Sequence, residues 1–327
     1  MSAPACLRPA ALAAACFLAA VASAPAFAQA WPSKQLTIVV PYPPGGGYDR
    51  LARLLGPRLA ERLKHPVVVD NKPGAGGTLG MTAVSRAPQD GHTLVVAGAG
   101  DIAISPFLYA NLPYDVQRDF LPVTMLASFP LLLVVHPKIP ANTVQELVAY
   151  VGSRPGGLSY ASSSIGSTGH ISSELFRTTT GLNLVHVPYK GTGPAVGDLV
   201  GGHVDMMITD AGALIPHVKA GKLRALAVTS ERRVRALPDV PTMAESGLNY
   251  EVTGWWGLFT PAGAPSAVVP ALYRETAAIL QAQDVRDQVE SLGAEVSGMP
   301  TAQFAAKIRA DVAKFGRAVK ASGAKLD

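Results

Sequence analysis

The sequence has 327 residues, of which 48% are hydrophobic and 16% charged, so it has room for two domains and is neither a disordered chain nor a coiled coil. Its formal net charge is +5, but the positive residues are scattered, without zinc-finger spacing or a basic block followed by aromatic residues. This charge pattern argues against nucleic-acid binding.

Residues 1–28 are predicted to be a cleaved secretory signal peptide. A basic residue and a short apolar run precede the sequence AFA at 26–28, which is typical of a cleavage site. The run is too short and too rich in alanine to favour a membrane anchor. Both cysteines, Cys6 and Cys16, lie in this segment, so the mature chain would have no thiol and no disulfide. These features predict a periplasmic protein.

The mature chain repeats one pattern, in which a run of β-branched residues is followed by a loop rich in Gly, Ser and Pro and then by a helical pattern. In the first part this predicts strands over 35–41, 66–70 and 93–97, and helices over 49–63, 78–86 and up to Tyr109. Later strands are predicted over 158–161, 184–187 and 204–208, followed by helices that end at Thr180, Val200 and Ala220. Helical patterns over 266–283 and 301–322 close the chain. This alternation predicts α/β units around mostly parallel sheets.

Two strand-like segments, 131–136 and 254–260, separate the two sets of units and predict two crossovers between two lobes. The first lobe would comprise residues 29–130 and 253–327, and the second lobe residues 131–252. Open α/β sheets bind ligands in crevices at the carboxyl ends of their strands. The cleft between the lobes is therefore the expected binding site.

Three Gly-rich loops, each between a predicted strand and a predicted helix, suit the binding of an anion. They are PPGGGYD at 43–49, SIGSTGH at 164–170 and KGTG at 190–193. The first N–H groups of a helix lack partners within the helix, glycine allows a ligand to come close, and the helix dipole favours negative charge. The second loop adds hydroxyl groups and Lys190 adds a positive charge. Together the loops favour a carboxylate ligand.

Each loop also has an explanation that needs no ligand. Gly-rich turns are common for steric reasons, and most of them bind nothing. Asp49, Ser167 and Thr168 would serve as helix caps, and His170 would pack against its own helix. Lys190, taken alone, would be solvated.

Sequence motifs of enzymes are absent. There is no G-x-S-x-G, H-E-x-x-H, C-x-x-C or P-loop sequence, and the seven histidines lack the spacing of metal ligands. A secreted hydrolase that uses Ser167 and His170 is a minor alternative. The sequence favours a protein without enzymatic activity, metal or cofactor.

Seven longer stretches cover essentially the whole mature chain in order. They are WPSKQLTIVVPYPPGGGYDRLARLL (31–55), VVVDNKPGAGGTLG (67–80), YASSSIGSTGHISSELF (160–176), VPYKGTGPAVGDLVGGHVDMM (187–207), PHVKAGKLRALAVTSERR (216–233), LPDVPTMAESG (237–247) and GWWGLFTPAGAP (254–265). The chain thereby resembles the Bug-type periplasmic solute-binding receptors of tripartite tricarboxylate transporters. The resemblance implies a type II periplasmic-binding-protein fold, an α/β fold of two lobes with mostly parallel sheets joined by two crossover strands. It also implies a small carboxylated solute and no enzymatic activity.

The resemblance further implies a set of ligand-binding residues, because family members hold a carboxylate largely through backbone N–H groups and ordered waters. In the first lobe these positions correspond to Gly45, Gly46, Tyr48 and Asp49. In the second lobe they correspond to Ser167, Thr168, His170, Gly191, Thr192 and Asp210. We add Tyr42, Ser164 and Lys190, which belong to the same loops.

Two positions depart from the residues usual in the family. Many relatives have a Thr-His pair where this chain has Asp101 and Ile102, and Tyr48 replaces a smaller residue. An acid in place of a neutral donor argues against a second ligand carboxylate in that direction. We therefore hypothesise a pocket that is smaller or more aromatic than a citrate site and accepts an aromatic or amino-bearing acid.

The resemblance implies a receptor that closes on its solute and passes it to the membrane subunits of a tripartite tricarboxylate transporter. The alternative is a co-receptor that presents the bound solute to a membrane sensor kinase. Neighbouring genes would distinguish the two, because transport requires two membrane subunits and signalling requires a sensor.

Overall fold

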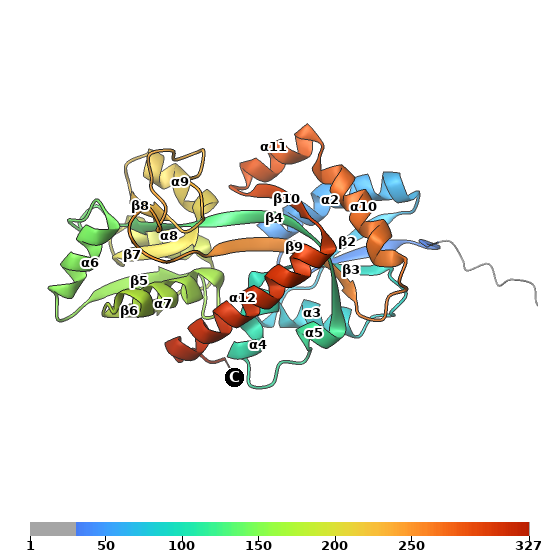
Figure 1. Cartoon of the computed structure of the whole chain (residues 1–327), viewed down its shortest axis with the longest axis horizontal. Helices are drawn as coiled ribbons and strands as arrows, with labels where there is room; N and C mark the ends of the chain where they lie inside the picture. Colours follow the sequence, from blue (N-terminus) through green and yellow to red (C-terminus); the bar gives the residue numbers. More distant parts are fainter. Residues whose placement is uncertain (1–30, 327) are drawn as a thin grey trace, which may run out of the picture.

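The computed structural model describes residues 31–326, so the predicted signal peptide and its cleavage site lie outside the described residues. Ten strands form one sheet in the order β2-β1-β3-β9-β4-β7-β5-β6, with β8 and β10 paired to β4. Figure 1 shows that β4 and β9 run along the middle of an elongated molecule, with the N-terminal units at one end and the units from β5 to β8 at the other.

The N-terminal end of the sheet consists of β1 (Leu36–Val40), β2 (Val67–Asn71) and β3 (Thr93–Gly98), and β1 pairs in parallel with both of the others. The helices α2 (Gly47–Leu63) and α3 (Thr78–Ser85) follow β1 and β2. These five elements confirm the predicted bounds to within two residues. The predicted short helix before Tyr109 is a π-helical turn followed by α4 (Ser105–Leu108).

At the other end, β5 (Leu158–Ser162) pairs in parallel with β6 (Leu184–Pro188) and β7 (Met206–Asp210). Each strand leads into a helix, as predicted. The helices are α7 (Thr168–Thr180), α8 (Thr192–Val200) and α9 (Ala211–Lys219).

The two ends are joined by β4 (Phe120–Val135) and β9 (Thr253–Pro261), which pair antiparallel. Residues 120–130 of β4 pair with β9, and residues 131–135 pair antiparallel with β7 and β8 (Arg224–Val228). The predicted crossover at 131–136 is therefore the last part of one longer strand. We call β1, β2, β3, β9, β10 and residues 120–130 the first half of the sheet, and β5 to β8 with residues 131–135 the second half.

Several elements differ from the sequence prediction. The predicted helix over 266–283 is α10 (Val268–Leu280), and a separate α11 (Gln283–Ser291) follows it. The sequence analysis did not identify four others, which are α5 (Val116–Asp119), α6 (Val144–Gly152), β8 and β10 (Glu295–Met299). β10 is short, half-exposed and contains Gly298, so it lacks the β-branched apolar run that marks the other strands.

The C-terminal helix α12 (Thr301–Ser322) lies along the molecule and contacts β4 at the centre and α7 at the far end (Figure 1). Phe304 packs edge-on against Trp255 of β9 with the ring centroids 5.1 Å apart, and the Trp255 indole N–H donates to Asp311 of α12 at 2.8 Å. Farther along, α12 lies against α7 of the second half. Within residues 31–326, no helix combines the length and the apolar character that crossing a membrane requires.

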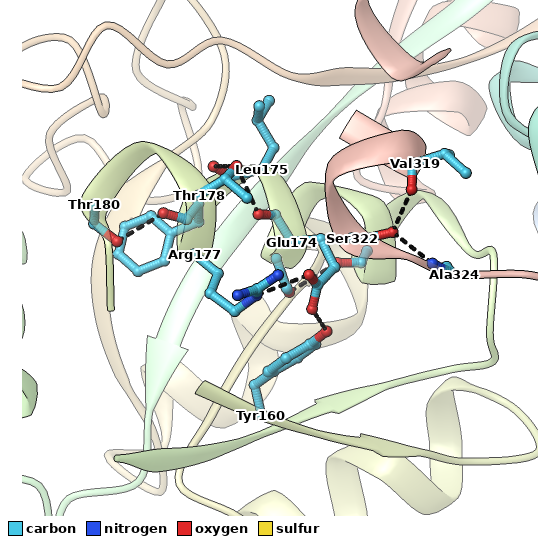
Figure 2. A network of polar contacts seen from close by, with 12 residues as sticks. Tyr160, Glu174, Leu175, Arg177, Thr178, Thr180, Val319, Ser322 and Ala324 are labelled. Carbon is cyan, nitrogen blue, oxygen red and sulfur yellow. Dashed lines mark hydrogen bonds and ion pairs between the residues drawn. The ribbon is translucent and has the colours of Figure 1, made fainter. Parts of the chain in front are cut away.

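A buried polar network stabilises α7 beside the end of α12 (Figure 2). Glu174, only 6% exposed, accepts hydrogen bonds from the Tyr160 hydroxyl of β5 and from the Arg177 guanidinium, the latter at 2.8 Å. A buried carboxylate is tolerated only when such partners replace water. The network therefore fixes α7, whose first turn lies at the cleft described below, against β5.

Replacing Glu174 by alanine should destabilise the fold, because it leaves the Tyr160 hydroxyl and the Arg177 guanidinium without their acceptor. We expect Glu174→Ala to lower the free energy of unfolding by about 1–3 kcal/mol in urea denaturation. Glu231→Ala is the matched control, because Glu231 is exposed and makes no side-chain hydrogen bond or ion pair with the described residues. Equal unfolding free energies for the two variants would contradict this role of Glu174.

Candidate functional site

A cleft of about 460 Å³ lies between the two halves of the sheet, at the carboxyl ends of the parallel strands. Its lining comes from the segments that follow β1, β2 and β3 on one side and β5, β6 and β7 on the other, with Phe129 and Trp256 from the central strands and Leu326 near the C-terminus. Nine of the predicted site residues line it: Tyr42, Tyr48, Ser164, Ser167, Thr168, Lys190, Gly191, Thr192 and Asp210. Four others, Gly45, Gly46, Asp49 and His170, do not.

The loop between β5 and α7 is closed by its own hydrogen bonds. Ser167 is the N-cap of α7, where its hydroxyl accepts from the backbone N–H of His170 at 3.1 Å and donates to the Ser164 carbonyl at 2.9 Å. The interpretation of Ser167 as a cap is thus correct for its side chain. The neighbouring Thr168 hydroxyl makes no hydrogen bond with the described residues, so it is available to a ligand in the cleft.

His170 is buried beneath this loop. Its Nδ1 accepts from the backbone N–H of Gly166 at 3.0 Å, and its ring stacks on His186 with centroids 4.0 Å apart. Burial, together with the neighbouring His186, lowers the pKa of His170 to about 3, so the ring is neutral. Since the Ser167 hydroxyl donates elsewhere, the two residues do not form the nucleophile and base that a hydrolase would need.

The loop between β6 and α8 brings a positive charge to the cleft. The backbone N–H of Gly191 donates to the Ser163 carbonyl at 2.7 Å, which ties this loop to the one after β5. Gly191 has a φ of +122°, a conformation that residues with a side chain rarely adopt. Lys190 is exposed, and within residues 31–326 its ammonium group forms no ion pair. Lys190, Thr192 and the start of α8 thus face the cleft as donors.

The loop between β1 and α2 is held by Asp49, which does not line the cleft. Its carboxylate accepts from the Gly45 N–H at 2.9 Å, from Arg53 at 3.0 Å and from Asn71 at 2.9 Å. Burial alone would raise the pKa of Asp49. The hydrogen bonds to its carboxylate, of which that from Arg53 has the largest effect, outweigh burial, so the pKa is lowered. The carboxylate is therefore engaged in fixing the loop that carries Tyr48.

Five aromatic residues line the cleft on the side of the first half: Tyr42, Tyr48, Tyr109, Phe129 and Trp256. All but Tyr109 pack against one another in a row, and we call these four the aromatic wall. Ring centroids are 4.4 Å apart for Tyr42 and Tyr48, 5.9 Å for Tyr48 and Trp256, and 4.4 Å for Phe129 and Trp256. A Cβ at Gly47 would lie 2.5 Å from the Trp256 ring, so this glycine makes room for the wall. Tyr42 and Tyr48 are among the site residues expected from the sequence, whereas Trp256 and Phe129, which carries no motif, are not.

Asp101 supports the aromatic wall from behind and does not line the cleft. It is 1% exposed, and its carboxylate accepts from the Tyr42 hydroxyl at 2.7 Å and from the Gly98 N–H at 2.8 Å. Burial raises the pKa of Asp101 to about 6 despite these two bonds. Burial and the Asp101 charge also raise the pKa of the Tyr42 hydroxyl well above its usual value, which keeps that hydroxyl protonated as a donor.

Asp210 lies at the end of β7, at the N-cap position of α9, but its side chain makes no capping hydrogen bond. None of the described residues donates a hydrogen bond to its carboxylate, and burial raises its pKa to about 6. Burial and Asp101 raise the pKa of Tyr48, and the charge of Asp210 adds to this effect. Asp210 of the second half and the aromatic wall of the first half thus line the same cleft.

The part of the chain that the structure describes holds no group of three or more His, Cys, Asp or Glu side chains that would bind a metal ion. The polar groups at the cleft are instead helix N-termini, hydroxyls, one lysine and one aspartate. Such an arrangement is suited to holding a small ionic solute by hydrogen bonds.

Comparison with known proteins shows relatives along most of the chain. The sequence model of the tripartite tricarboxylate transporter family receptor matches residues 51–324. BugT of Bordetella pertussis is 36% identical, over 93% of this chain and 94% of its own length. The R. palustris protein Rpa4515, solved with adipate, is 37% identical with a TM-score of 0.80, over 90% of this chain and 100% of that one. MatC from Rhodopseudomonas palustris, solved with bound malate, is 34% identical with a TM-score of 0.76, over 88% of this chain and 100% of that one.

These likenesses confirm the expected fold and the resemblance to Bug-type receptors. The architecture is the α/β fold of periplasmic binding proteins, with parallel strands at both ends and antiparallel pairs where the chain crosses between them. The matching proteins are periplasmic solute receptors and not enzymes, which rules out the hydrolase alternative. The chain is thus a member of the tripartite tricarboxylate transporter receptor family.

Proposed function

We propose that the protein is a periplasmic receptor that captures a small carboxylate in this cleft and delivers it to the membrane subunits of a tripartite tricarboxylate transporter. The observation that carries the proposal is the convergence of the α7 and α8 N-termini and Lys190 on one cleft. Relatives solved with adipate and malate support a carboxylate as the ligand. The signal-like residues 1–28 support export, and the family to which the chain belongs favours transport over presentation to a sensor kinase.

Capture would proceed by closure of two lobes, residues 29–130 with 253–327 and residues 131–252, about β4 and β9. In the open form the loops after β5 and β6 expose donors to water. A bound solute bridges the loops of both lobes and so stabilises the closed form, in which the membrane partner would recognise the receptor. Residues 120–130 and 131–135 of β4 pair with different strands, so flexing there moves the lobes without breaking either pairing.

The donors at the cleft are sufficient for useful affinity. A hydrogen bond to a charged group contributes about 1.5–3 kcal/mol. Three or four such bonds, after the ordering costs of binding, would support micromolar affinity at about −8 kcal/mol. Thr168, Thr192 and Lys190 each provide a side-chain donor, beside the backbone N–H groups of α7 and α8.

Removing the charge of Lys190 should weaken carboxylate binding. We expect Lys190→Gln to raise the Kd for adipate or malate about tenfold, because it removes a charge-assisted hydrogen bond. Titration calorimetry measures this, after a thermal-shift screen has identified which carboxylate binds. Lys222→Gln is the control, because Lys222 is exposed and does not line the cleft. Unchanged affinity in Lys190→Gln would show that Lys190 does not contact the ligand. If no carboxylate binds the wild type, the proposed function is refuted.

The raised pKa of Asp210 predicts a specific dependence of stability on pH. Because the folded pKa of about 6 exceeds the unfolded value of about 3.9, the folded protein binds more protons between these values, and stability falls as pH rises through them. Asp210→Asn removes this penalty, so the ligand-free variant should be more stable than the wild type at pH 7 by on the order of 2 kcal/mol.

Urea denaturation at pH 7 and pH 4 measures this difference, which should nearly vanish at the lower pH. The raised pKa of Asp101 acts equally in both proteins and cancels from the comparison. Asp239→Asn, at an exposed aspartate with no side-chain partner among the described residues, should match the wild type at both pH values. A stability gain in Asp210→Asn that is the same at both pH values would contradict the explanation by a raised pKa.

A further inference from the structure

We infer that the cleft selects a solute that carries an ammonium group as well as a carboxylate, with the ammonium held between Asp210 and the aromatic wall. The inference rests on the proposed function and deepens it, because it names amino acids as the substrate class. Four observations support it: the isolation of Asp210, its effect on an anionic solute, the chemistry of the wall, and the order of charges along the cleft.

The first observation is that Asp210 has no structural task within the described residues. It occupies the N-cap position of α9 without capping it, and its carboxylate accepts no hydrogen bond from residues 31–326. Asp49 shows the contrast, because its carboxylate accepts from three partners and fixes a loop. An ionised group that is largely removed from water needs a partner of opposite charge. Since residues 31–326 provide none for Asp210, a ligand would.

The second observation concerns the charge that Asp210 presents to a solute. A carboxylate that faces the cleft repels a second carboxylate nearby, most strongly once closure has excluded water. A dicarboxylate would place negative charge against this group or leave part of the cleft unused. An ammonium group would instead gain an ion pair there and relieve the unpaired charge.

The third observation is that the cleft lined by Asp210 is also lined by the aromatic wall. Tyr42 directs its hydroxyl to Asp101, and a Cβ at Gly98 would lie 2.3 Å from the Tyr48 hydroxyl, so that hydroxyl also points into the fold. These residues therefore offer the cleft their rings, next to the indole of Trp256. Aromatic faces attract cations, and tryptophan and tyrosine do so most strongly. An aromatic wall and a carboxylate in one cleft form the environment that an ammonium group prefers.

The fourth observation is the order of charges along the second half of the sheet. Lys190 follows β6, the start of α7 follows β5, and Asp210 ends β7, and these strands lie side by side in that order. Neighbouring strands are about 4.8 Å apart, so the positive and negative ends of the site are separated by about 10 Å. A carboxylate at the α7 N-terminus would then lie about 5 Å from an ammonium at Asp210, which suits an α-amino acid, whereas a carboxylate at Lys190 requires an amino acid whose two charges are well separated.

Four six-carbon solutes test the inference, because they differ only in the groups at issue. Norleucine and 6-aminohexanoate carry both charges, hexanoate lacks the ammonium, and adipate has a second carboxylate instead. We expect at least one of the two amino acids to bind the wild type about tenfold or more tightly than hexanoate and adipate in titration calorimetry. In Asp210→Asn this preference should shrink to within about threefold, while hexanoate binds as well as before or better.

Asp239→Asn serves as the matched control and should keep the preference, because Asp239 is exposed and does not line the cleft. Urea denaturation verifies that both variants are folded. If hexanoate or adipate binds the wild type as tightly as both amino acids, the inference is wrong while the proposed function stands. The same holds if Asp210→Asn retains the preference. If neither the four solutes nor malate binds, the proposed function is overturned and the inference with it.

Discussion

The cleft depends on one constraint, which is that β4 belongs to both halves of the sheet. Its residues 131–135 are completely buried and pair with β7 and β8, and the preceding residues pair with β9 and β10. A slip of one residue would turn every side chain of this strand to the opposite face and disrupt its close packing on both sides. The two sets of parallel strands therefore direct their carboxyl ends at one another, and the loops after β1, β5, β6 and β7 meet there.

Close packing on the first side of the cleft depends on glycines that leave room for large side chains. A Cβ at Gly77 would lie 2.7 Å from the Asp101 carboxylate and 3.0 Å from the Tyr42 hydroxyl, and Gly47 and Gly98 similarly make room for Trp256 and Tyr48. Some of these glycines are thus needed to make room for the aromatic wall. The remaining glycines of the loops are those that can bring backbone groups close to a ligand. The wall is held rigidly from behind, since the Asp101 carboxylate is itself fixed by the Gly98 N–H.

The sequence predicts the loops well, and also that they lie at one cleft. The alternation of strand, loop and helix does not depend on details of packing, and neither does the tendency of α/β sheets to bind ligands at the carboxyl ends of their strands. The sequence predicts individual side chains less well. Asp49 and Asp210 both read as acids at the start of a helix, yet the first accepts hydrogen bonds from three partners and the second from none of the described residues. The difference is due to Arg53, one turn along the same helix, and to Asn71 of β2. No local sequence pattern reveals a partner such as Asn71, which lies on a different element. The first part of β4 escaped recognition because Pro122 and Pro130 argue against a strand, whereas the structure places a register shift after Pro122.

The unpaired Asp210 also links binding to stability. A carboxylate that is partly buried without a partner lowers the stability of the ligand-free protein, and natural sequences retain such a residue where function requires it. Under the proposed closure, the same residue would favour the open, hydrated form until a cation neutralises it. The cost of desolvating the carboxylate in the empty cleft and its pairing with a cation in the filled one would then act in the same direction, so that closure would depend on the arrival of a solute with the right charges.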